Sequence, residues 1–120
     1  MALDHVFSPI DVGPVRLANR VVRSAQITGL GVGGIGPELI AYHEARARGG
    51  VGLTILEMAF VHPSSPNGID ASTDGIIDGY RLLMERLSPY GMPVFQQLNH
   101  HGRHALPKGL ANGRRDSGFV

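Results

Sequence analysis

The run VGLTILEM, residues 51–58, is almost continuously apolar and carries a single charged side chain, Glu57. A strand that is covered on both faces has this pattern, because no position along it has to be wetted, and such strands are typical of parallel sheets. We therefore predict a buried strand over Val51–Met58.

A helix is predicted before and after this strand. The first spans Pro37–Arg48, because proline suits the first helical position, where its missing N–H is not needed, and Gly49-Gly50 stops the helix. The second spans roughly Asp74–Tyr90, where apolar side chains recur at helical spacing. They form one stripe of Ile76, Tyr80, Leu83, Met84 and Leu87.

The remaining predicted strands flank these elements. A short hairpin over Ser8–Leu17 turns at Gly13-Pro14, a β-branched strand covers Arg20–Ser24, and another short strand covers Pro93–Leu98. The segment His62–Thr73, rich in Pro, Ser, Asn, Gly and Asp, is predicted to be a loop. Strands that alternate with helices predict an α/β fold with a parallel sheet and right-handed crossovers.

Composition excludes several classes of protein. The chain of 120 residues has the size of one domain, its net charge of +1 leaves no electrostatic footprint for nucleic acid or a membrane surface, and it has no cysteine for a disulfide or a thiolate site. The amino terminus lacks the basic and apolar regions of a signal peptide, and no apolar stretch approaches the roughly 20 residues that span a bilayer. We expect a soluble, cytoplasmic protein with a small-molecule partner.

Function is expected at three short segments. Ligands of parallel α/β folds sit beyond the carboxyl ends of the strands. Those ends are Ser24-Ala25-Gln26, Glu57-Met58 and Gln97-Leu98-Asn99-His100.

A glycine-rich loop offers an alternative, a small dinucleotide-binding module. Residues 29–34 match G-x-G-x-x-G, so the module would use Gly29, Gly31, Gly34 and Glu57, the last as its ribose-binding acid. Gln26-Ile27-Thr28 precede Gly29 where the fingerprint needs a tight turn at once, and Ile35-Gly36-Pro37 follow Gly34, so the amino terminus of the helix would miss a pyrophosphate. We therefore favour an ordinary loop.

Two polar residues and one histidine-rich segment each have two interpretations. Gln97 offers an acceptor and two donors that suit the edge of a planar heterocycle, or it is satisfied by neighbouring backbone. Glu57 is a site group or, as we favour, half of an ion pair with Arg20 or Arg23. The histidines of residues 100–104 suggest a metal site, but His100 is adjacent to the next histidine, so polar loop residues are the favoured interpretation and no metal ligand is assigned.

Four ordered motifs at these segments resemble one family, the Old Yellow Enzyme or NADH:flavin oxidoreductase family, and its 2,4-dienoyl-CoA reductase-like branch in particular. Residues 3–20, with LANR at their end, resemble its opening hairpin. The RSA of residues 23–25, the RGGVGL of residues 48–53 and the QLNHHGR of residues 97–103 resemble its next three motifs.

The resemblance implies the N-terminal part of a (β/α)8 TIM barrel that holds FMN at the carboxyl ends of its strands, with the hairpin plugging the opposite end. Ser24, Ala25 and Gln26 would line the flavin, with Met58 beside the ring in place of a usually small residue. Gln97 would bond the pyrimidine edge, and His100 would lie near the substrate.

The implied reaction is hydride transfer from NAD(P)H through FMN to an electron-poor C=C bond of a small molecule. Ile27 stands where many members place Thr or Cys near flavin N5, so redox tuning should differ. No catalytic residue can be assigned among the 120 residues.

The length of the chain sets the last expectation. A hairpin and three strands are too few to form a closed eight-stranded barrel. We therefore expect residues 1–120 to be the truncated, inactive N-terminal part of a longer enzyme, with exposed sheet edges. A non-catalytic interaction fragment is the other alternative. Gly31→Ala should abolish binding in the dinucleotide hypothesis and have little effect in the flavin hypothesis.

Overall fold

The computed structural model describes residues 3–105, and residues 1–2 and 106–120 lie outside this range. Three short 3-10 turns cover Asp74–Ile76, Ser88–Tyr90 and Gly102–His104. The helices and strands are α1 (Asp4–Phe7), β1 (Ile10–Val12), β2 (Val15–Leu17), β3 (Val22–Arg23), α2 (Pro37–Arg48), β4 (Leu53–Phe60), β5 (Ile69–Asp70), α3 (Ile77–Leu87) and β6 (Val94–Asn99).

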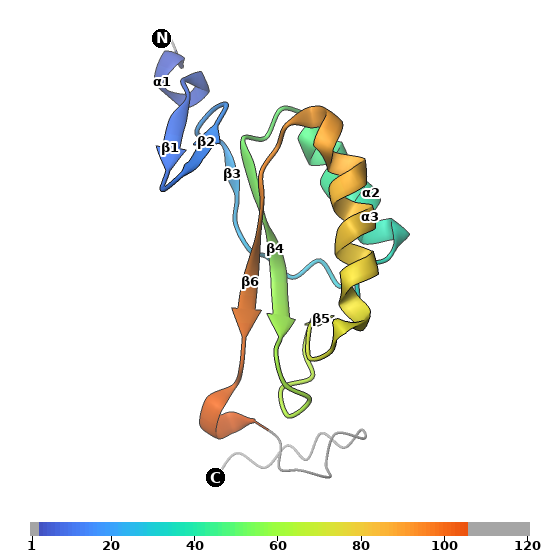
Figure 1. Ribbon diagram of the computed structural model, residues 1–120. Coiled ribbons are helices and arrows are strands. Elements are labelled where there is room, and N and C mark those ends of the chain that lie inside the picture. The colour runs from blue at the N-terminus through green and yellow to red at the C-terminus, as the bar shows by residue number, and fades with distance from the viewer. Residues whose placement is uncertain (1–2, 106–120) are drawn as a thin grey trace.

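The long strand β4 is the centre of a parallel sheet (Figure 1). Its Ala59 pairs with Leu98 of β6 and with Ile69 of β5, so β5 and β6 lie on opposite edges of β4. β3 pairs in parallel with the start of β4, where Val22 faces Leu53. The predicted α/β fold with a parallel sheet is confirmed, and the strands within residues 3–105 do not close into a barrel.

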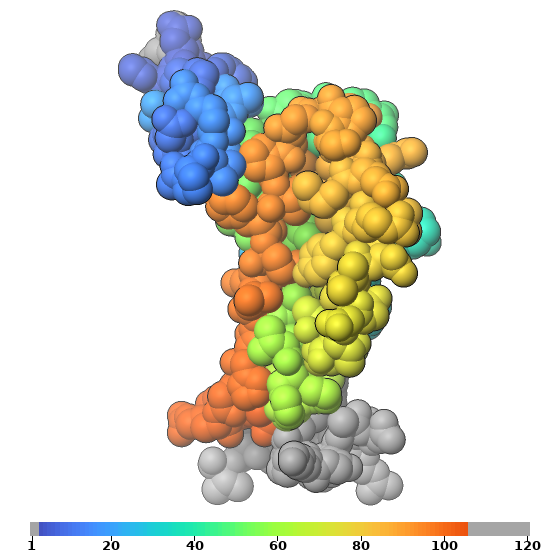
Figure 2. Space-filling view, in the orientation of Figure 1, coloured from blue at the N-terminus to red at the C-terminus, as the bar shows by residue number. Residues whose placement is uncertain are grey.

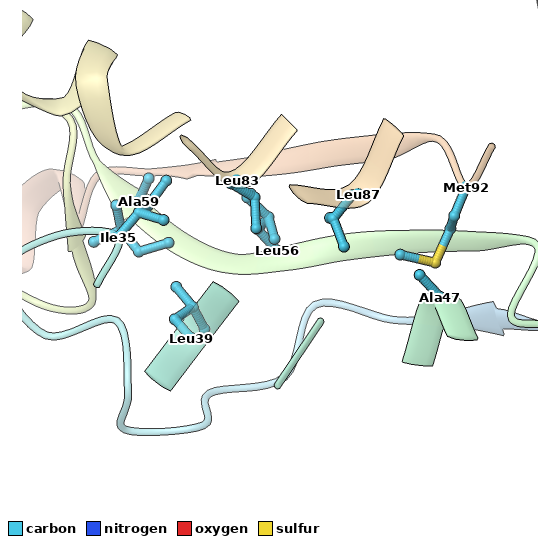
Figure 3. Close-up of a cluster of buried hydrophobic side chains, with 9 residues drawn as sticks. Ile35, Leu39, Ala47, Leu56, Ala59, Leu83, Leu87 and Met92 are labelled. Atoms are coloured by element: carbon cyan, nitrogen blue, oxygen red, sulfur yellow. The ribbon is translucent and has the colours of Figure 1, made fainter. Parts of the chain in front are cut away.

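Both helices, α2 and α3, pack against each other and cover the same face of the sheet (Figure 1). A cluster of buried apolar side chains fills the space between them and β4, with Leu39 of α2 and Leu83 of α3 meeting Leu56 of the strand (Figure 3). The apolar stripe predicted for the second helix faces this cluster through Tyr80, Leu83 and Leu87, whereas Met84 is 44% exposed and does not. The full cluster is Ile35, Leu39, Ala47, Leu56, Ala59, Ile69, Leu83, Leu87 and Met92.

The hairpin lies at the amino-terminal end of the sheet and projects from the main body (Figures 1 and 2). Val12 pairs with Val15, so Gly13-Pro14 forms the turn, as predicted. Asn19 connects the hairpin to the sheet: its Nδ2 donates to the Gly50 carbonyl at 2.8 Å, and its Oδ1 accepts from the Val21 N–H at 3.0 Å. Two of the family-like motifs are therefore in direct contact.

A bulge interrupts β4 where its functional segment begins. Leu56 pairs with Gln96, and the next pair is Ala59 with Leu98, so β4 has one residue more than β6 in this interval. Leu56 and Ala59 both lie in the buried cluster, although positions three apart on a regular strand face opposite sides. The extra residue falls at Glu57-Met58 and re-aims these two side chains.

Several predicted boundaries need correction. Ordered pairing in β3 is limited to Val22–Arg23 rather than Arg20–Ser24, and β4 is displaced to Leu53–Phe60. The predicted loop contains the two-residue strand β5, and α1 was not predicted at all. Such short elements have no periodicity of their own and depend on tertiary contacts.

Among the described residues, no helix is both long and apolar enough to cross a membrane.

Candidate functional site

The three predicted segments meet at one edge of the sheet, because β3, β4 and β6 run parallel and end on the same side (Figure 1). Ser24–Gln26 follow β3, Met58 lies near the end of β4, and Gln97 lies near the end of β6. The loops that follow β4 and β6 also contact each other at this edge.

Arg23 fixes the segment Ser24–Gln26. One guanidinium nitrogen donates to the carbonyl oxygens of Ser24 at 3.0 Å and Ile55 at 2.8 Å, and the other donates to the carbonyl of Gln26 at 2.9 Å. The guanidinium also lies 5.1 Å from the centre of the Tyr42 ring on α2, a cation–π contact. This segment is therefore anchored both to β4 and to a helix.

Glu57 is buried, with 1% of its surface exposed, and it holds the loop that follows. Its Oε2 accepts from the N–H and the hydroxyl of Thr28, each at 2.5 Å, and its Oε1 accepts from the Gly31 N–H at 2.9 Å. The predicted ion pair with Arg20 or Arg23 is wrong. Three donors satisfy the carboxylate, so its burial needs no cation, and the two arginines bind other oxygens.

The same contacts exclude the dinucleotide-binding arrangement. The Gly31 N–H is committed to Glu57, the Gly33 N–H donates to the Gly68 carbonyl, and the Gly34 N–H donates to the Gly31 carbonyl. These donors are therefore not directed at a phosphate. The glycine at position 31 is required for packing, since a Cβ there would meet the Glu57 carboxylate and stand 2.8 Å from Cγ1 of Ile69. We therefore expect Gly31→Ala to disturb this packing in a flavin enzyme as well, in contrast to the expectation from the sequence alone.

The two adjacent glutamines on β6 have different roles. Gln96 faces the helices: its Oε1 accepts from the Tyr80 hydroxyl at 2.8 Å, and its Nε2 donates to the carbonyls of Glu57 at 2.6 Å and Gln97 at 2.9 Å. Gln97 points to the opposite face and is exposed. The backbone-satisfied amide is thus Gln96, which sequence reasoning missed, and Gln97 is presented at the face that the helices leave open.

His100 is joined to the loop after β4. Its Nε2 lies 3.2 Å from the Ser64 hydroxyl, which lies 2.8 Å from Nδ1 of His62. Sequence reasoning missed His62 and Ser64, because they stand in a segment without periodicity and only the fold brings them beside His100. Within residues 3–105, no three His, Cys, Asp or Glu side chains are arranged to hold a metal ion.

Residues 5–118 match the sequence model of the NADH:flavin oxidoreductase / NADH oxidase family. The chain belongs to this family. The resemblance read from the four motifs is therefore confirmed at the level of this family.

Known relatives of this NADH:flavin oxidoreductase family member are much longer. The NADH oxidase of Thermoanaerobacter brockii is 36% identical over 115 residues, which make up 91% of this chain and 18% of that protein. N,N-dimethylglycine/sarcosine dehydrogenase of Chromohalobacter salexigens is 32% identical over 117 residues, 88% of this chain and 16% of that protein.

A solved structure gives the same assignment for the fold. The Old Yellow Enzyme from Pichia sp. AKU4542 superposes with a TM-score of 0.70 at 27% identity, over 84% of this chain and 28% of that chain. The described residues therefore correspond to the opening hairpin and first parallel strands of a TIM barrel, as predicted.

Proposed function

We propose that these residues form the first part of the FMN site of a flavin-dependent oxidoreductase. The observation that carries the proposal is the meeting of Ser24–Gln26, Met58 and Gln97 at one edge of the sheet, in a chain whose residues 5–118 match this family. Parallel α/β proteins place their ligands at this edge.

The residues have distinct tasks in this proposal. Ser24, Ala25 and Gln26 would present their backbone to the flavin, with Arg23 holding two of their carbonyl oxygens. Gln97 would donate to and accept from the pyrimidine edge, which favours a negative charge there. Met58 would pack beside the ring and exclude water. FMN, when bound, supplies the hydride chemistry.

The reaction we propose is hydride transfer from NAD(P)H to an electron-poor C=C bond of a small molecule, as in a 2,4-dienoyl-CoA reductase-like enzyme. A second candidate is oxidation of a small amine, which is favoured by the 32% identity to N,N-dimethylglycine/sarcosine dehydrogenase. Both reactions would use the same flavin edge.

A complete barrel needs strands beyond those described. β6 pairs with β4 on one edge only, and its Leu98, with 67% of its surface exposed, faces the side on which a further helix would pack. We propose that residues 1–120 act as one segment of a longer FMN-binding domain, in keeping with the 18% of the NADH oxidase that they span.

The test uses the full-length protein purified with its native ligand. We expect one non-covalent FMN per chain. For the first candidate reaction, NADH or NADPH should bleach the flavin absorbance, and an activated alkene should restore it. For the second candidate reaction, a secondary or tertiary amine should bleach the flavin absorbance directly. Gln97→Met should weaken FMN binding about tenfold, since a buried hydrogen-bonding edge loses its partner. Arg81→Met, on the exposed side of α3, serves as the control. A folded protein that never takes up FMN would contradict the proposal.

A further inference from the structure

A hydrogen-bonded bridge joins the loops that follow β4 and β6, outside the residues expected to hold FMN. Ser64 stands at its centre, between Nδ1 of His62 at 2.8 Å and Nε2 of His100 at 3.2 Å. The two imidazole rings lie edge to face with their centres 6.0 Å apart. The fully buried Ser65 anchors the bridge, because its hydroxyl accepts from the His101 N–H at 2.9 Å.

Backbone donors fix the direction of every bond in this bridge. The Ser64 N–H donates to Nδ1 of His62, and the Gly102 N–H donates to Nδ1 of His100. A ring nitrogen that accepts carries no proton, so the proton of each ring is on Nε2. His100 Nε2–H therefore donates to the Ser64 oxygen, and the Ser64 hydroxyl donates to the single Nδ1 lone pair of His62, which it shares with the Ser64 N–H.

The chain of donors ends at Nε2–H of His62. Each group that accepts a bond becomes a better donor, so a chain with one direction strengthens its last member. His62 is exposed, and no acceptor for its Nε2–H is found among residues 3–105. The bridge thus presents a polarised, fixed donor at the edge of the sheet where ligands bind.

The surrounding charge favours an acceptor that is an anion. Residues 61–68 and 99–105, which form the two loops of the bridge, contain no Asp or Glu, whereas Arg103 and three histidines, His100, His101 and His104, follow β6. A hydrogen bond to an ionised oxygen is roughly twice as strong as a neutral one. A carboxylate or phosphate oxygen therefore suits this donor better than a neutral or cationic group.

We propose that His62, Ser64 and His100 form a binding site for an anionic oxygen group of a small-molecule ligand, with His62 Nε2 as the contacting atom and Ser64 and His100 as positioning residues. The carboxylate of a substrate and the phosphate of a nucleotide share this chemistry. The site depends only on the loops after β4 and β6, so it stands or falls independently of the flavin assignment.

Histidine-selective ¹⁵N NMR on the full-length protein tests the site. At pH 7.5, both His62 and His100 should be Nε2–H tautomers, and inorganic phosphate or acetate, added in separate titrations, should shift the His62 Nε2 signal to saturation. Ser64→Ala should weaken that binding about five- to tenfold, the effect of one hydrogen bond. Ser88→Ala, at the end of α3, should leave it unchanged.

The outcome also identifies the source of the anion. Tighter binding of phosphate supports a nucleotide or other phosphate ligand, and tighter binding of acetate supports a carboxylate substrate. The proposal would be overturned if His62 or His100 were an Nδ1–H tautomer, or if the His62 Nε2 signal shifted linearly without saturation by either anion. It would also be overturned if the Ser64→Ala protein bound the anions as tightly as the unchanged protein. Apo and FMN-bound protein should give the same result, which separates this test from that of the flavin site.

Discussion

At the scale of single residues, Glu57 connects three parts of the molecule. Its carboxylate holds Thr28 and Gly31 of the loop after β3, and its carbonyl accepts from Gln96 of β6. Alternation along β4 turns Glu57 away from the helix-facing side on which Leu56 lies, and the bulge then returns Ala59 to that side. One buried acid thereby sets the path of the loop that begins at the proposed flavin segment.

Gly31→Ala tests this packing. The added methyl group would press on the Glu57 carboxylate and on Ile69, so we expect the free energy of unfolding to fall by about 1–3 kcal/mol. Urea denaturation of the full-length protein measures the change. Gly75→Ala is a matched control, because the nearest atom to its new Cβ would be Oγ1 of Thr73, at an ordinary 3.5 Å. Equal stability of the two variants would refute the packing account.

The burial of His43 leads us to expect that stability depends on pH. The ring is fully buried on α2, with Nδ1 3.0 Å from the Thr54 hydroxyl and Nε2 without a partner among the described residues. Burial, with the nearby charges of Arg23 and Arg46, lowers the pKa of His43 to about 4, against a raising effect of Glu57.

The sign of the effect follows from this lowered pKa. Above pH 6.5 the ring is neutral in both the folded and the unfolded chain, and below it the unfolded chain binds the proton first. Stability is therefore lost as the pH falls from about 6.5 towards 4, with a cost of about 2 kcal/mol at pH 5. Denaturation at pH 7.5 and pH 5 measures it, and His43→Gln should reduce the difference. A His43→Gln protein that keeps the full pH dependence would show that other groups cause it.

At the scale of elements, Arg23 determines the backbone that follows β3. Its planar guanidinium reaches three carbonyl oxygens at once, a geometry that a lysine cannot reproduce. We expect Arg23→Lys to speed hydrogen exchange of the amides of residues 25–27 and to weaken FMN binding about tenfold. Arg20→Lys is the control, since the only side-chain hydrogen bond of Arg20 within residues 3–105 goes to the Ser8 hydroxyl. Unchanged exchange at residues 25–27 in Arg23→Lys would contradict the positioning role.

Local signals explain which elements the sequence could predict. α2 begins at Pro37 and ends at Arg48 as predicted, because Pro37 and Gly49 are start and stop signals that act without tertiary contacts. β5 has only Ile69 and Asp70 and exists through its pairing with β4, so no local pattern announces it.

The candidate site also has features that the sequence predicts and features that it does not. Parallel strands place Ser24–Gln26, Met58 and Gln97 on one edge, and this much follows from the order of elements. The partners of Glu57 do not follow from it, because Thr28 and Gly31 lie in a loop whose path has no periodic signal in the sequence. Alternation along a strand does predict that Gln96 and Gln97 face opposite sides, but only the position of α3 shows which of the two faces the helices.

At the scale of the whole molecule, the joint between hairpin and sheet depends on close backbone contact. A Cβ at Gly52 would stand 2.5 Å from the carbonyl oxygen of Asn19 and 2.6 Å from its side-chain oxygen. Because a backbone carbonyl cannot move aside cheaply, we expect Gly52→Ala to lower the free energy of unfolding by about 3 kcal/mol and to speed exchange in the hairpin amides. Gly49→Ala, whose new Cβ would lie 3.4 Å from its nearest neighbours, is the control. A stable hairpin in Gly52→Ala would contradict this view of the joint.

The central claim is that FMN binds at the carboxyl edge of β3, β4 and β6. Hydrogen exchange of the full-length protein, compared with and without FMN, tests it most directly. We predict slower exchange in residues 24–28 and 96–99 when FMN is bound, with no change in the hairpin at the opposite end of the sheet. Protection confined to other parts of the protein, with residues 24–28 and 96–99 unaffected, would contradict the claim.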